Sequence, residues 1–549
     1  MDKKSILAIV LSLIVWILWM NFVEQPVQQK KESTVIKEVN RKPETEKREK
    51  IAFNRPERKS KITLISSNNK IEKKIEMSTE QFKARFSNRG AIIESFKWRE
   101  RDIELIVTNT NAKGFFDFPI HMSEEEFIWG SNLDKTLWNC KKISNNVISF
   151  SSRLSISGRP IKIEKIYTFY SNTHYFRIEY RLTNIGNRDF IFPNGYLLFS
   201  PADFLGPDMD FDNQYNHINS IYNLGGDFEK ETKGGGFFSN GESIKKENGV
   251  TRWVGLMSRY FLLLMIPEKF DGTGIICDLQ ENSGSRTGIY IPADLIEVGG
   301  KIRKSFKVYV GIKDKERLAA VDSSISDAAD ISKWIEPIRD FVLWCLLKIN
   351  ILMGNYGWSL VIFSILSKLV LFPLTMKSTE SMKKMQELSP IISELREKYK
   401  GKPEILNKKI MEIYKKNKVN PMSGCLPLLL QLPFFFALYS ALINSVDLWR
   451  APFILWIMDL SMPDTVYTFN NFNINILPIF MTLTTFIQQK LSSGSTMGQQ
   501  QKIMMLMPLV FIVIFWNMPS GLVLYWTLQN LLQILHQVYI NKKEDEVTV

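Results

Sequence analysis

Cysteine is scarce in this sequence, and motifs for catalysis or nucleotide binding are absent. The 549 residues include four cysteines, and none forms a CxxC pair or has a histidine at the spacing of a zinc site. The sequence also lacks HExxH, a serine-hydrolase motif and a glycine-rich loop ending in GK[ST]. The glycine-rich piece 225–241 therefore predicts a loop and not a phosphate cradle. These absences argue against an enzyme, and we expect no cofactor and no metal.

Nucleic-acid-binding patterns are missing as well, namely the RNP, helix-turn-helix and zinc-finger motifs. Membrane topology therefore explains the net charge of +13 better than nucleic acid does. The mean hydropathy of −0.09 is that of an ordinary soluble protein, but the average hides an uneven distribution. Apolar residues are concentrated in one N-terminal segment and in the last third of the chain.

The first apolar segment, Ser5 to Val23, follows two lysines and is long enough to span a membrane. It lacks the small-residue cleavage site of a signal peptide, so residues 1–23 are predicted to be an uncleaved transmembrane anchor. Residues 24–61 are rich in Lys, Glu, Gln and Pro and are predicted to be a flexible linker.

The next long apolar segment, Gly357 to Thr375, carries Lys368 near its middle. Nineteen residues at about 1.5 Å each span roughly 30 Å, which is the hydrocarbon core of a bilayer. A lysine at that depth costs about 2.5 to 3.5 kcal/mol unless it faces water or a partner. Ser364 and Thr375 extend a polar face along the same helix. We expect Lys368 to face a wet cavity; the alternative is a lysine that snorkels to the headgroups.

Residues 62–329 predict a different architecture, because their apolar residues recur with a period of two. Phe176, Ile178, Tyr180 and Leu182 alternate with charged residues. Many short strands separated by turns indicate an antiparallel β-sandwich. If this domain is extracytoplasmic, Cys140 and Cys277 either pair or remain two buried thiols.

Helical periodicity returns after the β-domain. Residues 330–353 predict an amphipathic helix that lies in the membrane interface or packs on the β-domain. Residues 376–419 predict a helical hairpin with twelve basic residues against six glutamates. By the positive-inside rule this hairpin is cytosolic. The further predicted spans are 421–445, 474–489, 503–518 and 521–540.

The loops give a consistent orientation for six spans with both termini cytosolic. The loop 446–473 is acidic and therefore outside, and the loop 490–502 is basic and therefore inside. The basic residues of the linker 24–61 are an exception, which we set aside because long domains translocate largely regardless of nearby charge. Residues 354–540 are thus a five-span core, and 541–549 are a cytosolic tail.

Polar residues recur on two of the predicted spans. Trp526, Gln529, Gln533 and His536 are three or four residues apart, and Thr482, Thr485, Gln488 and Gln489 lie near the cytosolic end of another span. Together with Ser364 and Lys368 they predict a hydrophilic cavity within the membrane. The alternative is hydrogen bonding between helices, which is common in membrane bundles. Because no Asp or Glu lies within any predicted span, Lys368 has no internal counter-ion.

Four segments carry a resemblance to a known family. They are KVNPMSGCLPLLLQLPFFFALYSAL at 418–442, FPLT at 372–375, QQQKIMMLMP at 499–508 and PSGLVLYW at 519–526. These segments resemble the YidC/Oxa/Alb membrane insertases from about residue 354 to 539. The anchor followed by a large β-domain is similar to the Gram-negative branch, whose β-domain resembles sugar-mutarotase sandwiches. That likeness gives no activity.

The resemblance implies a groove open to the cytosol and the lipid, in which a family arginine attracts translocating segments. Lys368 stands at the arginine position, and Ser364 replaces a threonine. Gln488, Tyr525 and Trp526 fall on the glutamine and aromatic positions of the groove. Lys368 suffices if charge alone matters and serves less well if bidentate pairing is needed.

The implied function is insertion and folding of integral proteins of the bacterial inner membrane, with the large domain in the periplasm. Nascent membrane proteins and the lipid bilayer are the expected partners, together with the Sec translocon. The cytosolic hairpin is expected to receive substrates, the ribosome or the signal recognition pathway. The rival hypothesis is a solute transporter that uses Lys368 as an anion site, although the repeated halves usual in transporters are absent.

Overall fold

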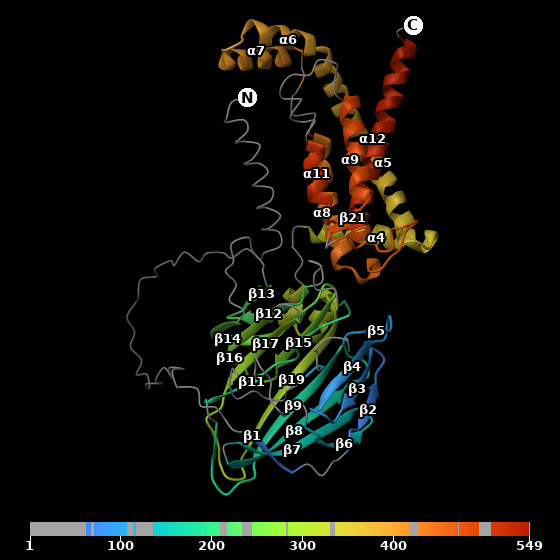
Figure 1. Ribbon diagram of the computed structural model, residues 1–549. Coiled ribbons are helices and arrows are strands. Elements are labelled where there is room, and N and C mark those ends of the chain that lie inside the picture. Colours follow the sequence, from blue (N-terminus) through green and yellow to red (C-terminus); the bar gives the residue numbers. More distant parts are fainter. Residues whose placement is uncertain are drawn as a thin grey trace. The chain divides into compact units, whose positions relative to one another are not determined.

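The computed structural model describes residues 62–66, 71–106, 114–116, 136–156, 158–192, 194–208, 217–232, 244–280, 284–329, 335–417, 419, 426–469, 472–492 and 507–547. The predicted anchor 1–23, the predicted linker 24–61 and Cys425 lie outside these residues. The chain divides into two compact units, a β-rich part that ends at Asp330 and a helical part that begins at Ile331 (Figure 1). Each is described by itself.

The β-rich part contains nineteen described strands and two short helical segments. The strands are β1 (Ile62–Ser66), β2 (Lys74–Ser78), β3 (Phe82–Ser87), β4 (Ile92–Trp98), β5 (Ile103–Glu104), β6 (Asn139–Ser144), β7 (Val147–Ile156), β8 (Arg159–Phe169), β9 (Tyr175–Asn184), β10 (Phe190–Ile191), β11 (Tyr196–Phe199), β12 (Asn219–Leu224), β13 (Asp227–Glu231), β14 (Ile244–Met257), β15 (Phe261–Pro267), β16 (Gly272–Gln280), β17 (Gly284–Pro292), β18 (Leu295–Ile296) and β19 (Lys301–Ile312). The helical segments are α3 (Lys315–Val321) and η2 (Ser323–Ala329).

The strands form one large antiparallel sheet, a smaller one of four strands, and the two-stranded sheet β10-β18. The large sheet follows the order β1-β7-β8-β9-β19-β15-β14-β16-β17-β11, and β6, β12 and β13 pair at its sides. The smaller sheet has the order β2-β3-β4-β5. The predicted alternation on β9 is confirmed, because Phe176, Ile178, Tyr180 and Leu182 are all buried. Tertiary pairing then brings β19, the last strand, between β9 and β15.

Aromatic packing joins the large sheet and the four-stranded one. Phe86 of β3 meets Tyr167 of β8 with ring centroids 4.9 Å apart. Lys165, which is fully buried, donates from Nζ to the carbonyl oxygens of Ala91 at 2.8 Å and Phe116 at 2.6 Å. Ala91 has a positive φ of 55° in the turn before β4. The lysine thus bonds two buried carbonyl groups outside the strand ladders, and the hydroxyl of Tyr167 also donates to the carbonyl of Ala91 at 3.2 Å.

Two predictions about this part are settled by the structure. Cys140 and Cys277 are free, so they do not pair, but only Cys277 is buried, and Cys140 is half-buried. The predicted loop 225–241 is wrong in one segment, because β13 (Asp227–Glu231) forms a hairpin with β12. Gly225 and Gly226 provide the positive φ values that this tight turn needs. Its apolar residues are too few for the strand period to stand out in the sequence.

The helical part contains α4 (Glu336–Met353), α5 (Tyr356–Glu387), α6 (Ser389–Lys398), α7 (Pro403–Lys416), α8 (Leu426–Asn444), η4 (Val446–Leu448), β20 (Thr465–Phe469), β21 (Phe472–Asn475), α9 (Leu477–Ser492), α11 (Met507–Phe515) and α12 (Ser520–Val547). Helix α5 runs from the end of this part that holds α4 and β21 to the end that holds α6 and α7 (Figure 1). Helix α12 packs against α5, α8 and α9.

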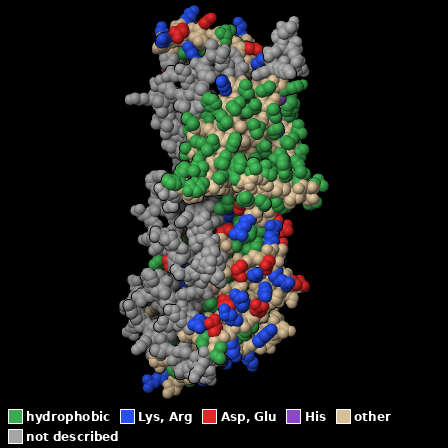
Figure 2. Space-filling model, turned by 45° about the vertical axis from the view of Figure 1, so that its right-hand side comes forward, with side chains coloured by type: hydrophobic (Ala, Val, Ile, Leu, Met, Phe, Trp, Pro, Cys, Tyr) green, Lys and Arg blue, Asp and Glu red, His purple; other side chains and the backbone are tan. Residues whose placement is uncertain are grey.

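Among the described residues, one helix is long and apolar enough to cross a membrane, the segment Tyr356–Met385 of α5. A shorter apolar helix covers Gln431–Asn444. Hydrophobic side chains cover most of the visible face of the helical part, whereas charged side chains are frequent on the β-rich part (Figure 2). Such an apolar surface is expected where lipid tails replace water.

The helix boundaries differ from the predicted ones at several places. Ile474, predicted to begin a span, lies in strand β21, and the helix begins at Leu477. The predicted tail 541–549 continues α12 as far as Val547. Helix α5 continues past the predicted end at Thr375 to Glu387, with Pro373 inside it.

Gly357 near the start of α5 allows Phe453 to approach the helix closely, since a Cβ at Gly357 would lie 2.0 Å from Cδ2 of Phe453.

Candidate functional site

Lys368 on α5 faces α12. Its Nζ atom donates a hydrogen bond to Oε1 of Gln533 at 2.7 Å, and the pair is partly buried. No ion pair of Lys368 occurs among the residues that the structure describes. A neutral amide therefore takes the place of a counter-ion, which satisfies one of the three ammonium hydrogens and leaves the charge uncompensated.

Polar side chains continue this contact along both helices. The Nε2 atom of Gln529 donates to the carbonyl oxygen of Ser364 and to Oγ of Ser367, each at 3.0 Å. Ser364 is fully buried and donates from Oγ to the carbonyl of Leu360 at 2.7 Å. Gln529 and Gln533 are one turn apart on α12, so both face α5. We call Ser364, Ser367, Lys368, Gln529 and Gln533 the polar layer.

Tyr525 and Trp526 are neighbours in sequence but face different helices. Tyr525 is buried, its ring lies 6.3 Å from that of Phe363 on α5 between centroids, and its hydroxyl group lies near Ser367 of the polar layer and Gln431 of α8. Trp526 is buried in an aromatic cluster, where its ring lies 5.3 Å from Phe435 and 5.4 Å from Phe515, measured between centroids. The structure thus brings Tyr525 to the polar layer and places Trp526 against α8 and α11.

Gln488 lies on α9 and is half-buried. Other polar residues of α9 make the contact with α12: Nδ2 of Asn530 donates to Oγ1 of Thr485 at 2.7 Å and of Thr484 at 3.4 Å. Thr485 in turn donates to the carbonyl of Met481 at 2.7 Å. This contact matches the alternative of inter-helix hydrogen bonding for Thr485.

His536 ends the polar face of α12 that is turned towards α5. Its ring lies 4.9 Å from that of Phe372, between centroids. Its Nδ1 atom is buried and has no hydrogen-bond partner among the described residues. Sequence reasoning placed His536 in the polar row of its helix but missed this contact, which depends on how α5 and α12 pack together.

Comparison with known proteins accounts for both parts of the chain. A family model described as "60Kd inner membrane protein" matches residues 348–546, and one described as "YidC periplasmic domain" matches residues 74–345. A membrane protein insertase YidC from Syntrophus aciditrophicus (strain SB) is 32% identical over 571 residues, which cover 99% of this chain and 100% of the relative. The chain belongs to the YidC family of membrane protein insertases. Its β-rich part is the periplasmic domain of that family.

A second relative has the same name, and two solved structures are similar to parts of the chain. The YidC insertase of Leptospira interrogans serogroup Icterohaemorrhagiae serovar Lai (strain 56601) is 35% identical over 457 residues, 73% of this chain and 72% of the relative. A crystal structure of an active YidC insertase, with its first transmembrane domain resolved, has a TM-score of 0.36 and 18% identity over 87% of this chain and 94% of that one. A galactose mutarotase-like protein from Lactobacillus casei ATCC 334 has a TM-score of 0.32 and 13% identity over 43% of this chain and 100% of its own.

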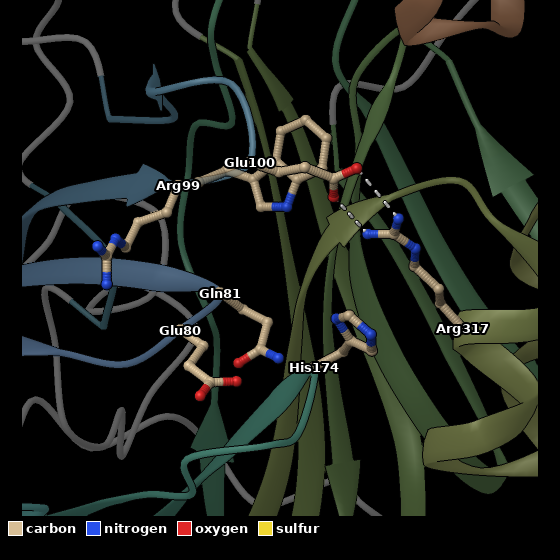
Figure 3. A pocket seen from close by; sticks show the side chains of 7 residues that line it. Glu80, Gln81, Arg99, Glu100, His174 and Arg317 are labelled. Atoms are coloured by element: carbon tan, nitrogen blue, oxygen red, sulfur yellow. Dashed lines mark hydrogen bonds and ion pairs between the residues drawn. The ribbon is translucent and has the colours of Figure 1, made fainter.

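The periplasmic domain has a pocket of about 530 Å³ (Figure 3). It is lined by Glu80, Gln81, Trp98, Arg99, Glu100, His174 and Arg317. Arg317 on α3 donates from Nη1 to Oε2 of Glu100 at 2.9 Å, which ties α3 to the end of β4. Burial lowers the pKa of His174, and the neighbouring Arg317 lowers it further. The sequence had given His174 no role.

In the described ranges, no group of three or more His, Cys, Asp or Glu is close enough to hold a metal ion. The thiol of Cys277 is buried, and burial raises its pKa to about 12. Such a thiol stays protonated at neutral pH and is neither a metal ligand nor a nucleophile.

Proposed function

We propose that this chain inserts integral proteins into the bacterial inner membrane, and that Lys368 briefly holds the hydrophilic part of the substrate. The observation that carries the proposal is the contact of Lys368 with Gln533, an ammonium group bound to a neutral amide between two apolar helices. Nothing in the sequence of the spans supplies a carboxylate. An acidic group on a passing chain is therefore a better partner than any the bundle offers.

The exchange of partners has a clear energetic direction. Hydrogen bonds between an ammonium group and a carboxylate are roughly twice as strong as those between neutral groups. The Coulomb energy is on the order of 4 kcal/mol at 4 Å and an effective dielectric constant of 20, before desolvation is deducted. A substrate carboxylate displaces the Gln533 amide, and Gln533 takes Lys368 back when the substrate leaves. The attraction is strong enough to guide a segment and weak enough to release it.

The route follows the polar layer. Ser364 and Tyr525 both precede the level of the Lys368–Gln533 contact, on α5 and α12 respectively. We assign Gln488 of α9 to the part of the route nearer the cytosolic end. Trp526 acts as part of the apolar wall, because it packs among phenylalanines of α8 and α11. The apolar segment of the substrate leaves sideways into lipid between the third and fifth spans, α8 and α11.

The orientation rests on charge. We propose six spans with both termini in the cytosol, the first within residues 1–23. The hairpin of α6 and α7 is cytosolic because basic residues predominate in residues 376–419. Helix α4 lies in the outer interface, since Phe341 and Trp344 are exposed on one face and stack on each other. Nascent membrane proteins are the substrates, and the Sec translocon, ribosome and signal recognition pathway are the proposed partners.

The transporter alternative has no support from the relatives, whose names are those of insertases. One experiment separates the two functions. Proteoliposomes that contain the purified chain are given a radiolabelled small anion and, separately, a newly made single-span protein with an acidic tail. We expect protease-protected insertion of the tail and no anion uptake above empty liposomes. Anion uptake without insertion, in vesicles of the same protein content, overturns the proposal.

A further inference from the structure

The loop between α8 and α9 contains a β-hairpin that the insertion route does not use. Strands β20 and β21 pair Tyr467 with Ile474, Thr468 with Asn473 and Phe469 with Phe472. Paired residues point to the same face of a hairpin, and successive pairs alternate between faces. One face therefore carries Tyr467, Phe469, Phe472 and Ile474, and the opposite face carries Thr468 and Asn473. We call the first the aromatic face.

The aromatic face is largely exposed in the described part of the chain. Tyr467 is 62% exposed, Phe469 61% and Phe472 58%. The opposite face is satisfied internally, since Oγ1 of Thr468 donates to Oδ1 of Asn473 at 2.8 Å. Neither strand contains a charged residue. Exposed apolar strands of this kind invite aggregation in water, so the face needs a cover.

The hairpin is held firmly to the helices. The carboxylate of Asp464 accepts hydrogen bonds from the backbone N–H groups of Ile476 at 3.0 Å and Leu477 at 2.7 Å, where α9 begins. Phe472 stacks on Trp516 at the end of α11, with centroids 5.5 Å apart, and Nε1 of Trp516 donates to the carbonyl of Asn473 at 2.9 Å. The aromatic face is thus fixed in orientation relative to α9 and α11.

The apolar surface continues from the hairpin onto the helix that follows. Ile474 of the aromatic face is three residues before α9, which exposes Ile479, Phe480 and Leu483. The hairpin also lies at the same end of the helical part as α4 (Figure 1). Tyr and Trp at the ends of apolar helices, here Tyr467 and the neighbouring Trp516, are typical of the boundary between headgroups and acyl chains.

We propose that the aromatic face of the β20–β21 hairpin rests in the headgroup–acyl boundary of the outer leaflet, with lipid as its partner. The depth follows from the backbone. The outer edges of a two-stranded hairpin leave N–H and C=O groups unpaired, which the hydrocarbon core does not tolerate but the hydrated boundary does. The hairpin fixes how deep the ends of α9 and α11 sit, close to the exit side of the insertion route. This inference rests on the proposed membrane placement of the helices.

The test uses the full chain in liposomes, with its four cysteines replaced by alanine and one cysteine added for an environment-sensitive dye. Dye positions are Tyr467→Cys and Phe469→Cys on the aromatic face, and Thr468→Cys on the opposite face as the matched control. Val370→Cys, exposed on α5, reports the hydrocarbon region, and Val250→Cys, exposed on β14, reports water. Quenching is compared between lipids spin-labelled near the headgroup and lipids spin-labelled deep in the acyl chain.

We expect dyes at 467 and 469 to lose most of their emission to the shallow quencher, more than the dye at 468, while the dye at 370 responds to the deep one. If the dyes at positions 467 and 469 are quenched no more than the dye at position 250, while the dye at position 370 is still quenched, the inference is overturned. The proposed function is then unaffected. If the dyes at 467 and 469 are instead shielded from the lipid quenchers to an extent that increases with the protein density in the liposomes, a second copy of the chain covers the aromatic face. That result also overturns the inference. If the dye at position 370 is not quenched, α5 does not lie in the membrane. Both the proposed insertion function and the proposed lipid contact of the hairpin are then overturned.

Discussion

Nζ of Lys368 lies 2.7 Å from Oε1 of Gln533, although the two residues are 165 positions apart in the chain. The contact joins α5 to α12 and gives a lysine within an apolar helix a partner that carries no charge. Removing the Gln533 side chain and removing the Lys368 side chain therefore have different consequences. Without Gln533 the ammonium loses a hydrogen bond, whereas without Lys368 the route loses its cation.

The charge of Lys368 is expected to decide the insertion rate of acidic substrates. Lys368→Arg keeps the rate for a Sec-independent protein with an acidic translocated tail, Lys368→Ala slows it several-fold, and Lys368→Glu slows it most. About 1 kcal/mol, a quarter of the Coulomb energy above, corresponds to a roughly fivefold change in rate. Insertion is followed by protease protection at equal abundance of each variant in the membrane.

A matched substrate provides the control for that series. Replacing the acidic residues of the tail by neutral ones is expected to make its insertion insensitive to all three changes at Lys368. If Lys368→Glu inserts the acidic tail as fast as the unaltered chain, charge plays no part, and the polar layer matters only as a hydrated path.

Gln529 is expected to stabilise the contact between α5 and α12. Gln529→Leu removes the two hydrogen bonds to Ser364 and Ser367. Hydrogen bonds between membrane helices contribute about 0.6 kcal/mol on average and up to about 1.7 kcal/mol. We expect a lower midpoint of thermal unfolding in detergent. Leu531→Ala, at an exposed position of the same helix, is the control, and an equal loss in both variants contradicts the assignment.

His174 is expected to titrate below its usual pKa in the folded protein, because burial and then Arg317 disfavour its charged form. The unfolded chain then binds the proton more readily, with a pKa of about 6.5. The stability that His174 contributes is present above that pH and decreases as the pH falls through it. With four histidines in the sequence, NMR of histidine-labelled full chain resolves the titration.

Arg317→Gln provides the check on the cause. It removes the positive charge beside His174 and frees Glu100, which favours the imidazolium form. The pKa of His174 is expected to rise in this variant. His217, whose pKa is lowered by burial alone, is expected to keep its titration. A shift of both histidines together points to general loosening of the domain.

The periplasmic domain is expected to be dispensable for insertion, because the contacts of the polar layer all lie between residues 360 and 533. Strand β19 pairs with β9 over nine residues, so removing only residues 62–200 exposes the edge of the remaining sheet. The cleaner variant deletes residues 62–329 as a whole. It is expected to support growth of cells depleted of their own insertase. No growth despite normal membrane abundance makes the domain part of the mechanism.

The proposed orientation is tested by labelling with a membrane-impermeant thiol reagent in intact spheroplasts. A cysteine at Asn172, in the turn between β8 and β9, is expected to react, and one at Lys400, between α6 and α7, is expected to be spared. Lys400 is preferable to Gly401, whose φ of 89° disfavours any other residue. If Lys400→Cys is labelled and the cysteine at Asn172 is not, the orientation is the opposite of the one proposed.

Much of the fold is written in local patterns. The period of two on β9 predicted which side chains are buried, because neighbouring residues of a strand face opposite sides. The length of the apolar run around Lys368 predicted α5, and the amide row of α12 was visible from spacing alone. The structure of short segments was harder to predict from the sequence. The hairpin β20–β21 has strands of five and four residues, and its face becomes evident only once the pairing register is known.

The sequence by itself determined the family and the division into a β-rich and a helical part. It also determined that Lys368 lies within an apolar segment and that no predicted span contains an Asp or Glu. Only the tertiary structure decided which residues surround that lysine. Tyr525 reaches the polar layer while Trp526 turns to α8 and α11, because successive residues of a helix point about 100° apart. The choice of Gln533 as partner depends on how α5 and α12 pack, and packing between distant segments is set by the whole bundle and not by local periodicity.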